Sequence, residues 1–589
     1  MTENKYSKAN LAYLFVLLLM VGIRIWLIWG MPKMIMYAPH DDLYYAKIAH
    51  YIANGQWMGP YDEMTLIKAP FYAFFLIASS VSGLSLFVSE TLFYVGACFV
   101  FFFALRPLIK NRWARLLILT FLVYAPLAMP TTINLRVYRE FVYLSLSLYI
   151  VAFAVGFILR LNHPWTNLLI WSIGLGLSIG AFLITREDGM WIFPIMILLL
   201  LCCLILIWLW KLDHKAGRIL LVVVPIMLAA LPTLIVFELN YSHYGFWGVT
   251  EQLDPEFQRV LSLMSRIEVD NASWSPTIQI SRAQRNMAYQ ASPLLKGVQS
   301  SIEKTILWFI DGSISGQQMK PAWYIQQYPV TPNEIGNSHF PWALRMAVAG
   351  DGFYSNATTA HMFYKQVADQ LEAACNDGRL KCRSSFSIPI VGSIDQRQDP
   401  LIFRMGYEGG LSILKSRSIK VQSVDFSAWE VWPGAKDDYV YFDEFTHNPV
   451  DVRLLNANAD AAGKSGDATI GMKLLPYQHK LLAKVAQIYA RFSWPLSIAG
   501  FIAWLYIVIK AILKKERTVV LFAIASTFTL AMLLTRLITL SIVDATTTIS
   551  GLAYGTSILL FAFLFFSMTL SYAAQDLFRL LGSRSLREH

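Results

Sequence analysis

The chain has 589 residues, of which 56% are hydrophobic, with a mean hydropathy of +0.46 and a formal net charge of +10. Uncharged apolar stretches such as residues 190–210 are long enough to be transmembrane helices, which excludes an ordinary soluble globular protein. Most basic residues cluster in short connections between these stretches, and no basic stretch is interleaved with aromatic residues, so we expect no nucleic-acid partner.

The chain begins with a predicted span that is followed by a loop with charged residues. Two lysines precede the span, residues 11–30, so the amino terminus is predicted to be cytoplasmic. Adjacent Asp41 and Asp42 then open a short helix. Because carboxylates are costly to hold at a membrane surface, this pair is predicted to serve a site. Lys68 leads into apolar residues 70–81, which we expect to lie along the outer interface, since only one span fits before the next basic cluster.

Charge counting along the rest of the chain predicts a polytopic α-helical membrane protein with about ten transmembrane helices. The predicted spans are 11–30, 89–105, 116–129, 141–159, 168–184, 190–210, 219–239, 494–512, 519–540 and 549–570. Three parts follow: a seven-span module (1–239), a soluble extracytoplasmic domain (240–491) and a three-span bundle with a cytoplasmic tail (492–589). Short loops and this charge pattern favour a bacterial inner membrane, with both termini cytoplasmic and the large domain periplasmic.

The inserted domain is long enough to bury a core of its own. Residues 359–374 carry apolar side chains on one face and are predicted to form a helix. Aromatic and β-branched residues 439–442 are predicted to form a strand, so we expect an α+β fold. Cys375 and Cys382 lie seven residues apart, and either they pair in an oxidising compartment or they remain two free thiols.

Charged residues recur in the loops that the topology places at the outer membrane surface. Carboxylates can take a proton from a hydroxyl or hold a divalent metal, whereas arginine and lysine hold phosphate. The alternative is that these charges serve solvation and topology alone. Arg536 with Asp544 would either line a lipid-carrier groove or form a salt bridge. The set is Asp41, Asp42, Lys68, Arg136, Arg139, Glu140, Arg186, Glu187, Asp188, Arg536 and Asp544.

Histidines of the inserted domain lack a recognisable ligand spacing. We therefore expect His243, His339 and His361 to be surface or packing residues rather than ligands or acid–base groups.

Four short motifs, in chain order, resemble those of the GT-C membrane glycosyltransferases, the superfamily that includes protein mannosyltransferases and the lipid A aminoarabinose transferase. The family pattern D-E-x-x-Y-x-x-x-A-x-x-x-x-x-G reads D-D-L-Y-Y-A-K-I-A-H-Y-I-A-N-G here, with Asp42 where glutamate is usual. The family's K-P-P-L-Y reads K-A-P-F-Y, with one proline missing. The other two motifs are R-E-F-V-Y-L around Glu140 and T-R-E-D-G at 185–189. The resemblance covers about the first 240 residues.

The resemblance implies an inverting transfer of a hexose or pentose from a polyprenyl-phosphate carrier to an acceptor on the outer face. Carried over by position, Asp41 is the general base on the acceptor hydroxyl. Asp42 and Glu140 orient the acceptor, or hold a divalent cation (Mg or Mn) if one is used. A helix N-terminus lowers the pKa of Asp41 whereas neighbouring Asp42 raises it, and the sequence does not decide between them.

The same resemblance implies that the basic residues bind the phosphate of the donor. Arg186 binds the donor phosphate, with Lys68 or Arg139 in support. Glu187 and Arg536 are placed with the same substrate-binding set. The acceptor is a cell-envelope lipid, glycan or protein, and the inserted domain is expected to choose it.

Other functions fit parts of the sequence. A glycan polymerase or ligase would also use an undecaprenyl-linked donor. A lipid-linked glycan transporter would need inverted repeats and broken spans near the midplane, which the sequence does not suggest. A catalytically inactive relative is favoured by the two departures from the motifs, and opposed by Asp41 and Arg186.

Overall fold

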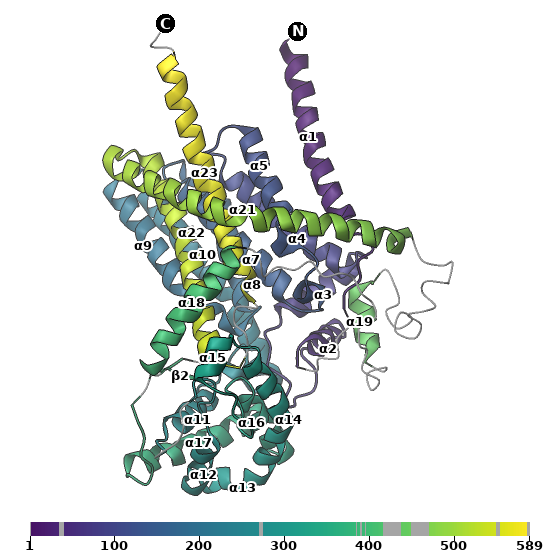
Figure 1. The fold of residues 1–589 in the computed structure, drawn as a ribbon, viewed down its shortest axis with the longest axis vertical. Coiled ribbons are helices and arrows are strands. Elements are labelled where there is room, and N and C mark those ends of the chain that lie inside the picture. Colours follow the sequence, from purple (N-terminus) through teal and green to yellow (C-terminus); the bar gives the residue numbers. More distant parts are fainter. Residues whose placement is uncertain are drawn as a thin grey trace.

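The computed structural model describes residues 2–34, 40–269, 275–384, 386–388, 392–394, 396–415, 438–448, 470–548 and 554–585. Within these residues the chain is almost entirely helical (Figure 1). Its N-terminal part consists of α1 (Thr2–Trp26), α2 (Asp42–Ala53), α3 (Phe71–Val81), α4 (Leu86–Ala104), α5 (Arg112–Val123), η1 (Pro126–Ala128), α6 (Thr132–Leu135), α7 (Glu140–Ile158), η2 (Trp165–Leu168), α8 (Leu169–Leu183), η3 (Glu187–Ile192), α9 (Phe193–Leu209) and α10 (Lys215–Tyr244).

The inserted part follows α10, and three long helices close the chain. The insertion contains η4 (Glu251–Leu253), α11 (Pro255–Arg266), α12 (Arg282–Ala291), α13 (Pro293–Gly297), α14 (Gln299–Gln318), α15 (Ala322–Gln327), α16 (Phe340–Gly350), α17 (Ala357–Asn376), β1 (Phe386–Ile388), β2 (Gly392–Ile394), η5 (Gln396–Gln398), α18 (Asp399–Leu414) and α19 (Tyr439–Thr446). The closing helices are α21 (Ile470–Lys514), α22 (Arg517–Thr546) and α23 (Thr556–Ser585).

Most of the predicted spans coincide with helices long enough to cross a membrane. The described residues contain 8 such helices, and each overlaps a predicted span. The predicted span 116–129 is instead a pair of helical segments, 112–123 and 126–135, bent by 48°. The predicted first span corresponds to a shorter apolar stretch, Asn10–Trp26. Residues 549–553, where the last span was predicted to begin, lie outside the described residues. The chain is a multi-pass membrane protein.

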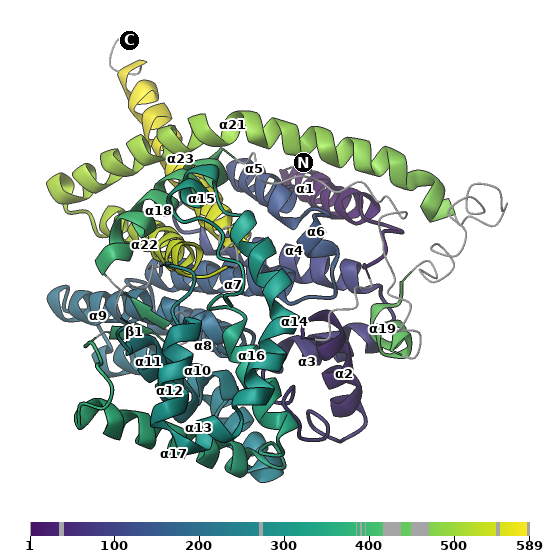
Figure 2. The ribbon, with the colours of Figure 1, turned by 60° about the horizontal axis from the view of Figure 1, so that its bottom comes forward.

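The arrangement of the ends agrees with the predicted topology. The start of α1 and the end of α23 lie at one end of the molecule, and α11–α14, α16 and α17 lie towards the opposite end (Figure 1). Helix α21 runs crosswise to α23 in both views (Figures 1 and 2). The predicted part boundaries at 239 and 491 fall inside α10 and α21, so neither boundary is a break in the chain's helices. Which end faces the cytoplasm stays a prediction.

The α+β prediction for the insertion is wrong. In the described part of residues 240–491, the strands are β1 and β2, which pair antiparallel, and the other regular elements are helices. The strand predicted at 439–442 is part of α19. There Phe442 and Phe445, three residues apart, are both buried where α19 packs on α2 and α3, so the helical period matches the contact surface better than the strand period does.

The predicted helix at 359–374 is confirmed, and of the two alternatives left open for the cysteines the structure has the disulfide. The helix is α17, whose first turn is capped by the side chain of Asn356. Cys375 and Cys382 form a disulfide. The bridge fastens the end of α17 to a segment that also contacts the end of α11, where the backbone N–H of Glu268 donates to the carbonyl of Lys381 at 2.8 Å.

The described residues form two large hydrophobic cores and a small third cluster around Tyr324, Leu401 and Met405. One runs through the membrane helices, and a second lies inside the insertion among α11, α12, α14, α16 and α17. Buried Arg345 of α16 ties the insertion to the loop between α2 and α3. It forms an ion pair with Glu251 at 2.9 Å and donates to the carbonyl of Glu63 at 2.9 Å. The insertion is therefore held directly above that loop.

Candidate active site

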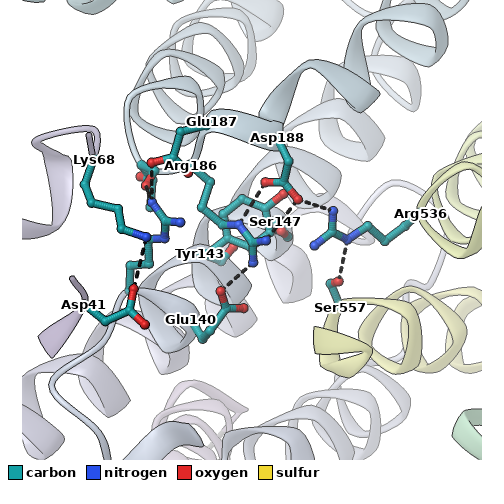
Figure 3. A network of polar contacts seen from close by, with 12 residues as sticks. Asp41, Lys68, Glu140, Tyr143, Ser147, Arg186, Glu187, Asp188, Arg536 and Ser557 are labelled. Carbon is teal, nitrogen blue, oxygen red and sulfur yellow. Dashed lines mark hydrogen bonds and ion pairs between the residues drawn. The ribbon is translucent and has the colours of Figure 1, made fainter. Parts of the chain in front are cut away.

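A cavity of about 380 Å³ lies between the N-terminal helices and the insertion. Its membrane-side wall combines four segments that are distant in the sequence: the start of α2, the loop before α3, the residues before α7 and the turn between α8 and η3. We call this wall the charged floor. It consists of Asp41, Lys68, Arg139, Arg186, Glu187 and Asp188, most of which are drawn in Figure 3.

Asp41 is the partly exposed carboxylate of the floor. It lies at the N-terminal end of α2, and its Oδ1 is 3.0 Å from Lys68 Nζ. Arg136 lies 3.5 Å from the other oxygen. Burial alone would raise the pKa of Asp41, but the charges of Lys68 and Arg136 lower it to about 2. The cations therefore prevail over both burial and the neighbouring Asp42, and Asp41 is ionised at neutral pH.

Asp42 lies behind the floor rather than in it. Its side chain is fully buried and accepts hydrogen bonds from the Arg136 guanidinium, with Nε at 3.1 Å from Oδ2. Burial raises the pKa of Asp42 to about 6 despite this partner. Since Arg136 also contacts Asp41, Asp42 positions Arg136 and acts on the cavity through it.

Arg186 is the centre of a second network (Figure 3). Its Nε and Nη2 donate to the two carboxylate oxygens of Asp188 at 2.8 and 3.0 Å, and its Nη1 donates to Glu140. Asp188 in turn accepts from Arg536 Nη1 at 2.9 Å. A two-pronged guanidinium–carboxylate pair of this kind fixes orientation as well as charge. The plane of the Arg186 guanidinium is thus set by residues of three helices.

Arg139 forms the third ion pair of the floor. Its Nη1 lies 2.8 Å from Glu187 Oε1 and also donates to the carbonyl of Thr185 at 3.2 Å. Among the described residues, the buried donors Arg139 Nε and Arg536 Nη2 have no hydrogen-bond partner. Arg139 lines the cavity, and buried donors are costly to leave unpaired, so its side of the cavity favours an anionic group.

The structure brings together five of the predicted site residues as cavity lining: Asp41, Lys68, Arg139, Arg186 and Glu187. Asp42, Glu140 and Arg536 do not line it. Glu140 and Arg536 hold Arg186 and Asp188 of the floor from behind, whereas Asp42 holds Arg136, which contacts Asp41. The suggested salt bridge between Arg536 and Asp544 is wrong, because Arg536 pairs with Asp188 whereas Asp544 pairs with Lys320 at 3.1 Å. Arg536 is fully buried and so does not itself line a groove.

The two predicted cation ligands do not fit a divalent metal. Asp42 faces the guanidinium of Arg136, and Glu140 faces that of Arg186. Positive partners at both carboxylates oppose a cation. In the described ranges, no three His, Cys, Asp or Glu side chains come close enough to form a metal site.

The wall opposite the floor comes from the insertion, and we call it the neutral roof. The described residues that it contributes to the cavity are all aromatic, amide, hydroxyl, aliphatic or imidazole side chains, among them Phe309, His339 and Trp342. Burial lowers the pKa of His339, so it is neutral at pH 7. His339 lines the cavity and lies beside the Phe309 ring, and the expectation that it is a surface or packing residue rather than a ligand or acid–base group stays a prediction. Sequence reasoning missed Trp342, because an aromatic residue in a helix of the insertion has no local pattern that marks it.

Comparison with solved structures finds two similar chains, the crystal structures of ArnT from Cupriavidus metallidurans in the apo state and bound to undecaprenyl phosphate. Sequence identities are 14% and 13%, and TM-scores are 0.31 and 0.30. The matches cover 84% and 83% of this chain and 80% and 79% of those chains. Such scores support no statement about activity. No family model matches the chain, and no curated protein matches it.

Proposed function

We propose that this protein is a membrane glycosyltransferase that moves a sugar, with inversion, from a polyprenyl-phosphate carrier to an acceptor at the outer face of the membrane. One observation supports it above all others. A carboxylate that is ionised at neutral pH, Asp41, lies in one cavity with Lys68, Arg139 and Arg186. A base beside a cluster of cations is the arrangement that transfer from a phosphate leaving group requires.

The cations act on the leaving group. Arg186 and Arg139 are held rigidly by their carboxylate partners, so they present fixed donors to the phosphate oxygens. As the bond between the anomeric carbon and the phosphate oxygen breaks, negative charge develops on that oxygen. Donors already in place stabilise this charge without reorganisation. Polyprenyl phosphate leaves with the electron pair of the broken bond.

Asp41 acts on the acceptor. The acceptor hydroxyl oxygen attacks the anomeric carbon from the face opposite the phosphate, which inverts the configuration, and its proton passes to Asp41. A carboxylate with a pKa of about 2 is a weak base, so its partner must change during the reaction. Each cation of the floor already faces a carboxylate, and Lys68–Asp41 is the pair with the most exposed carboxylate. A phosphate that attracts Lys68 raises the pKa of Asp41 and makes it the stronger base.

The test uses purified protein in detergent with a panel of polyprenyl-phosphate sugars, and a native lipid and glycan extract as acceptor. Wild type is expected to release free polyprenyl phosphate from one of the donors. Asp41→Asn is expected to lower the rate by about 10²–10⁴-fold, the usual contribution of a general base. Asp351→Asn, a carboxylate on the insertion that accepts from Ser301 at 2.8 Å, is the matched control and should leave the rate unchanged.

Two outcomes would overturn the proposal. Release at equal rates by wild type and Asp41→Asn would remove Asp41 as the base. Absence of release from every donor, with the protein folded by its thermal melting, would favour a ligase, a transporter or an inactive relative.

A further inference from the structure

The roof and the floor differ in the kind of group that they can bind. The floor offers full charges, whereas the described lining residues of the roof offer aromatic rings, a few aliphatic side chains and neutral hydrogen-bonding groups. Amides, hydroxyls and neutral imidazole both donate and accept hydrogen bonds, so they suit hydroxyl groups rather than ions.

Aromatic rings form a continuous patch where the roof meets the floor. The Trp342 ring lies 4.8 Å from the His40 ring, His40 lies 6.3 Å from Phe309, and Phe309 lies 6.1 Å from His339 (centroid distances). His40 directly precedes Asp41 in the chain. Burial lowers the pKa of His40, so this ring too is neutral at pH 7. We call these four rings the aromatic patch.

The aromatic patch lies beside the proposed base. Lys68 Nζ is 5.8 Å from the centre of the Trp342 ring and 3.0 Å from Asp41 Oδ1. A molecule in the cavity that contacts Trp342 therefore also comes close to Lys68 and, through it, to Asp41. A pyranose ring has an apolar face of C–H groups and a rim of hydroxyls. The negative face of an indole attracts the C–H face, and the amides and the carboxylate take the hydroxyls.

We propose that Trp342, with the rest of the aromatic patch, forms a subsite for a sugar ring of the acceptor, so that the acceptor is a carbohydrate. This inference rests on the proposed function and adds the chemical class of its acceptor. The cavity volume of about 380 Å³ lies in the range of small-ligand sites. Trp342 belongs to the insertion, so acceptor choice resides in that part of the chain.

The experiment separates acceptor binding from donor turnover. Detergent-purified protein is applied to an array of defined oligosaccharides, and the best-bound one is titrated to give its Kd. Wild type is expected to bind a subset of the array, and Trp342→Ala to weaken binding at least tenfold. Trp342→Phe keeps an aromatic face and should restore part of the affinity. Trp308→Ala is the matched control, because Trp308 lies on α14 next to Phe309 but is 75% exposed.

Each outcome has one meaning. The inference fails if wild type binds no oligosaccharide, if Trp342→Ala binds as wild type does, or if Trp308→Ala loses as much affinity. Thermal melting shows whether each variant is folded, and Trp342→Phe still tests the subsite if the alanine variant does not fold. Donor release without oligosaccharide binding would refute this inference alone. Binding without release from any donor would refute the proposed function alone.

Discussion

The charged floor and the neutral roof enclose one cavity, but they are held in place by different forces. Floor residues are fixed by ion pairs between segments far apart in the chain, such as Asp188 with Arg536. Roof residues are fixed by the insertion's own core and by hydrogen bonds to the end of α22, such as Asn337 Nδ2 to the carbonyl of Thr546 at 2.5 Å. We infer from this difference that the floor carries out the chemistry and that the roof selects the acceptor. Substitutions should then affect the two sides differently.

Removal of Arg186 is the most severe test of the floor. Arg186→Met leaves Glu140 and Asp188 buried without their central cation, and breaking a buried ion pair from one side typically costs about 3–5 kcal/mol. We expect a large drop in thermal melting temperature and loss of donor turnover. The control is Arg379→Met, whose side chain is 57% exposed and pairs with Asp377. Exposed pairs contribute about 0–1 kcal/mol, so equal effects of the two substitutions would contradict the picture of a floor held by ion pairs.

The disulfide tests the stability of the insertion, which carries the neutral roof. Cys375 and Cys382 close a short loop within the insertion, and closing so small a loop stabilises a fold by about 2–3 kcal/mol in the chain-entropy model. Replacing both by serine should lower the melting temperature of the insertion and leave donor turnover at low temperature unchanged. Chemical reduction of wild type provides the control, because it should reproduce the shift. If donor turnover at low temperature falls as well, the activity of the floor depends on the stability of the insertion, and the two sides do not act separately.

The junction between roof and membrane helices is tightly packed at Gly316. A Cβ at this position would lie 2.6 Å from the carbonyl oxygen of Thr548, so the backbone must move to accept it. Gly316→Ala should cost about 1–3 kcal/mol, the usual cost of overpacking. Gly297→Ala, in a helix with no atom within 4 Å of the added Cβ, is the control and should be neutral or slightly stabilising. Weakened acceptor binding with unchanged donor turnover would locate the effect in the roof.

The sequence predicted the floor better than the roof for physical reasons. Asp41, Lys68 and Arg186 lie in short motifs next to apolar spans, where local spacing and charge counting are informative. The partner of Arg536 could not be found in this way, because Asp188 lies 348 positions away and pairs with it only in the folded chain. Trp342 carries no local signal for the same reason, since its role depends on the loop that holds His40 and Lys68.

Secondary structure shows the same contrast. The apolar spans were predicted well because burial in lipid requires long helices whatever the tertiary contacts. The segment at 439–442 was predicted as a strand from its aromatic content, but strand propensity depends strongly on context. There the surface offered by α2 and α3 decides the conformation, and that surface exists only in the folded protein.

Lys68 gives the last and smallest expected effect, and it tests how the floor works. Removing its charge, as in Lys68→Met, should raise the KM for the donor by about tenfold, or about 1.4 kcal/mol. It should also raise the pKa of Asp41, because Lys68 is the foremost of the charges that lower it to about 2.

In wild type, Asp41 has a pKa below its unfolded value of about 3.9, so the stability it contributes is present above pH 4 and is lost as the pH falls towards 2. In Lys68→Met the pKa of Asp41 lies closer to its unfolded value, so this contribution to stability should be smaller and its loss should be complete at a higher pH. The acid limb of kcat/KM for donor release should also move to higher pH. Arg379→Met is again the control. A profile that does not move would mean that Lys68 does not restrain the basicity of Asp41, and that the exchange of partners on phosphate binding is not how the base is activated.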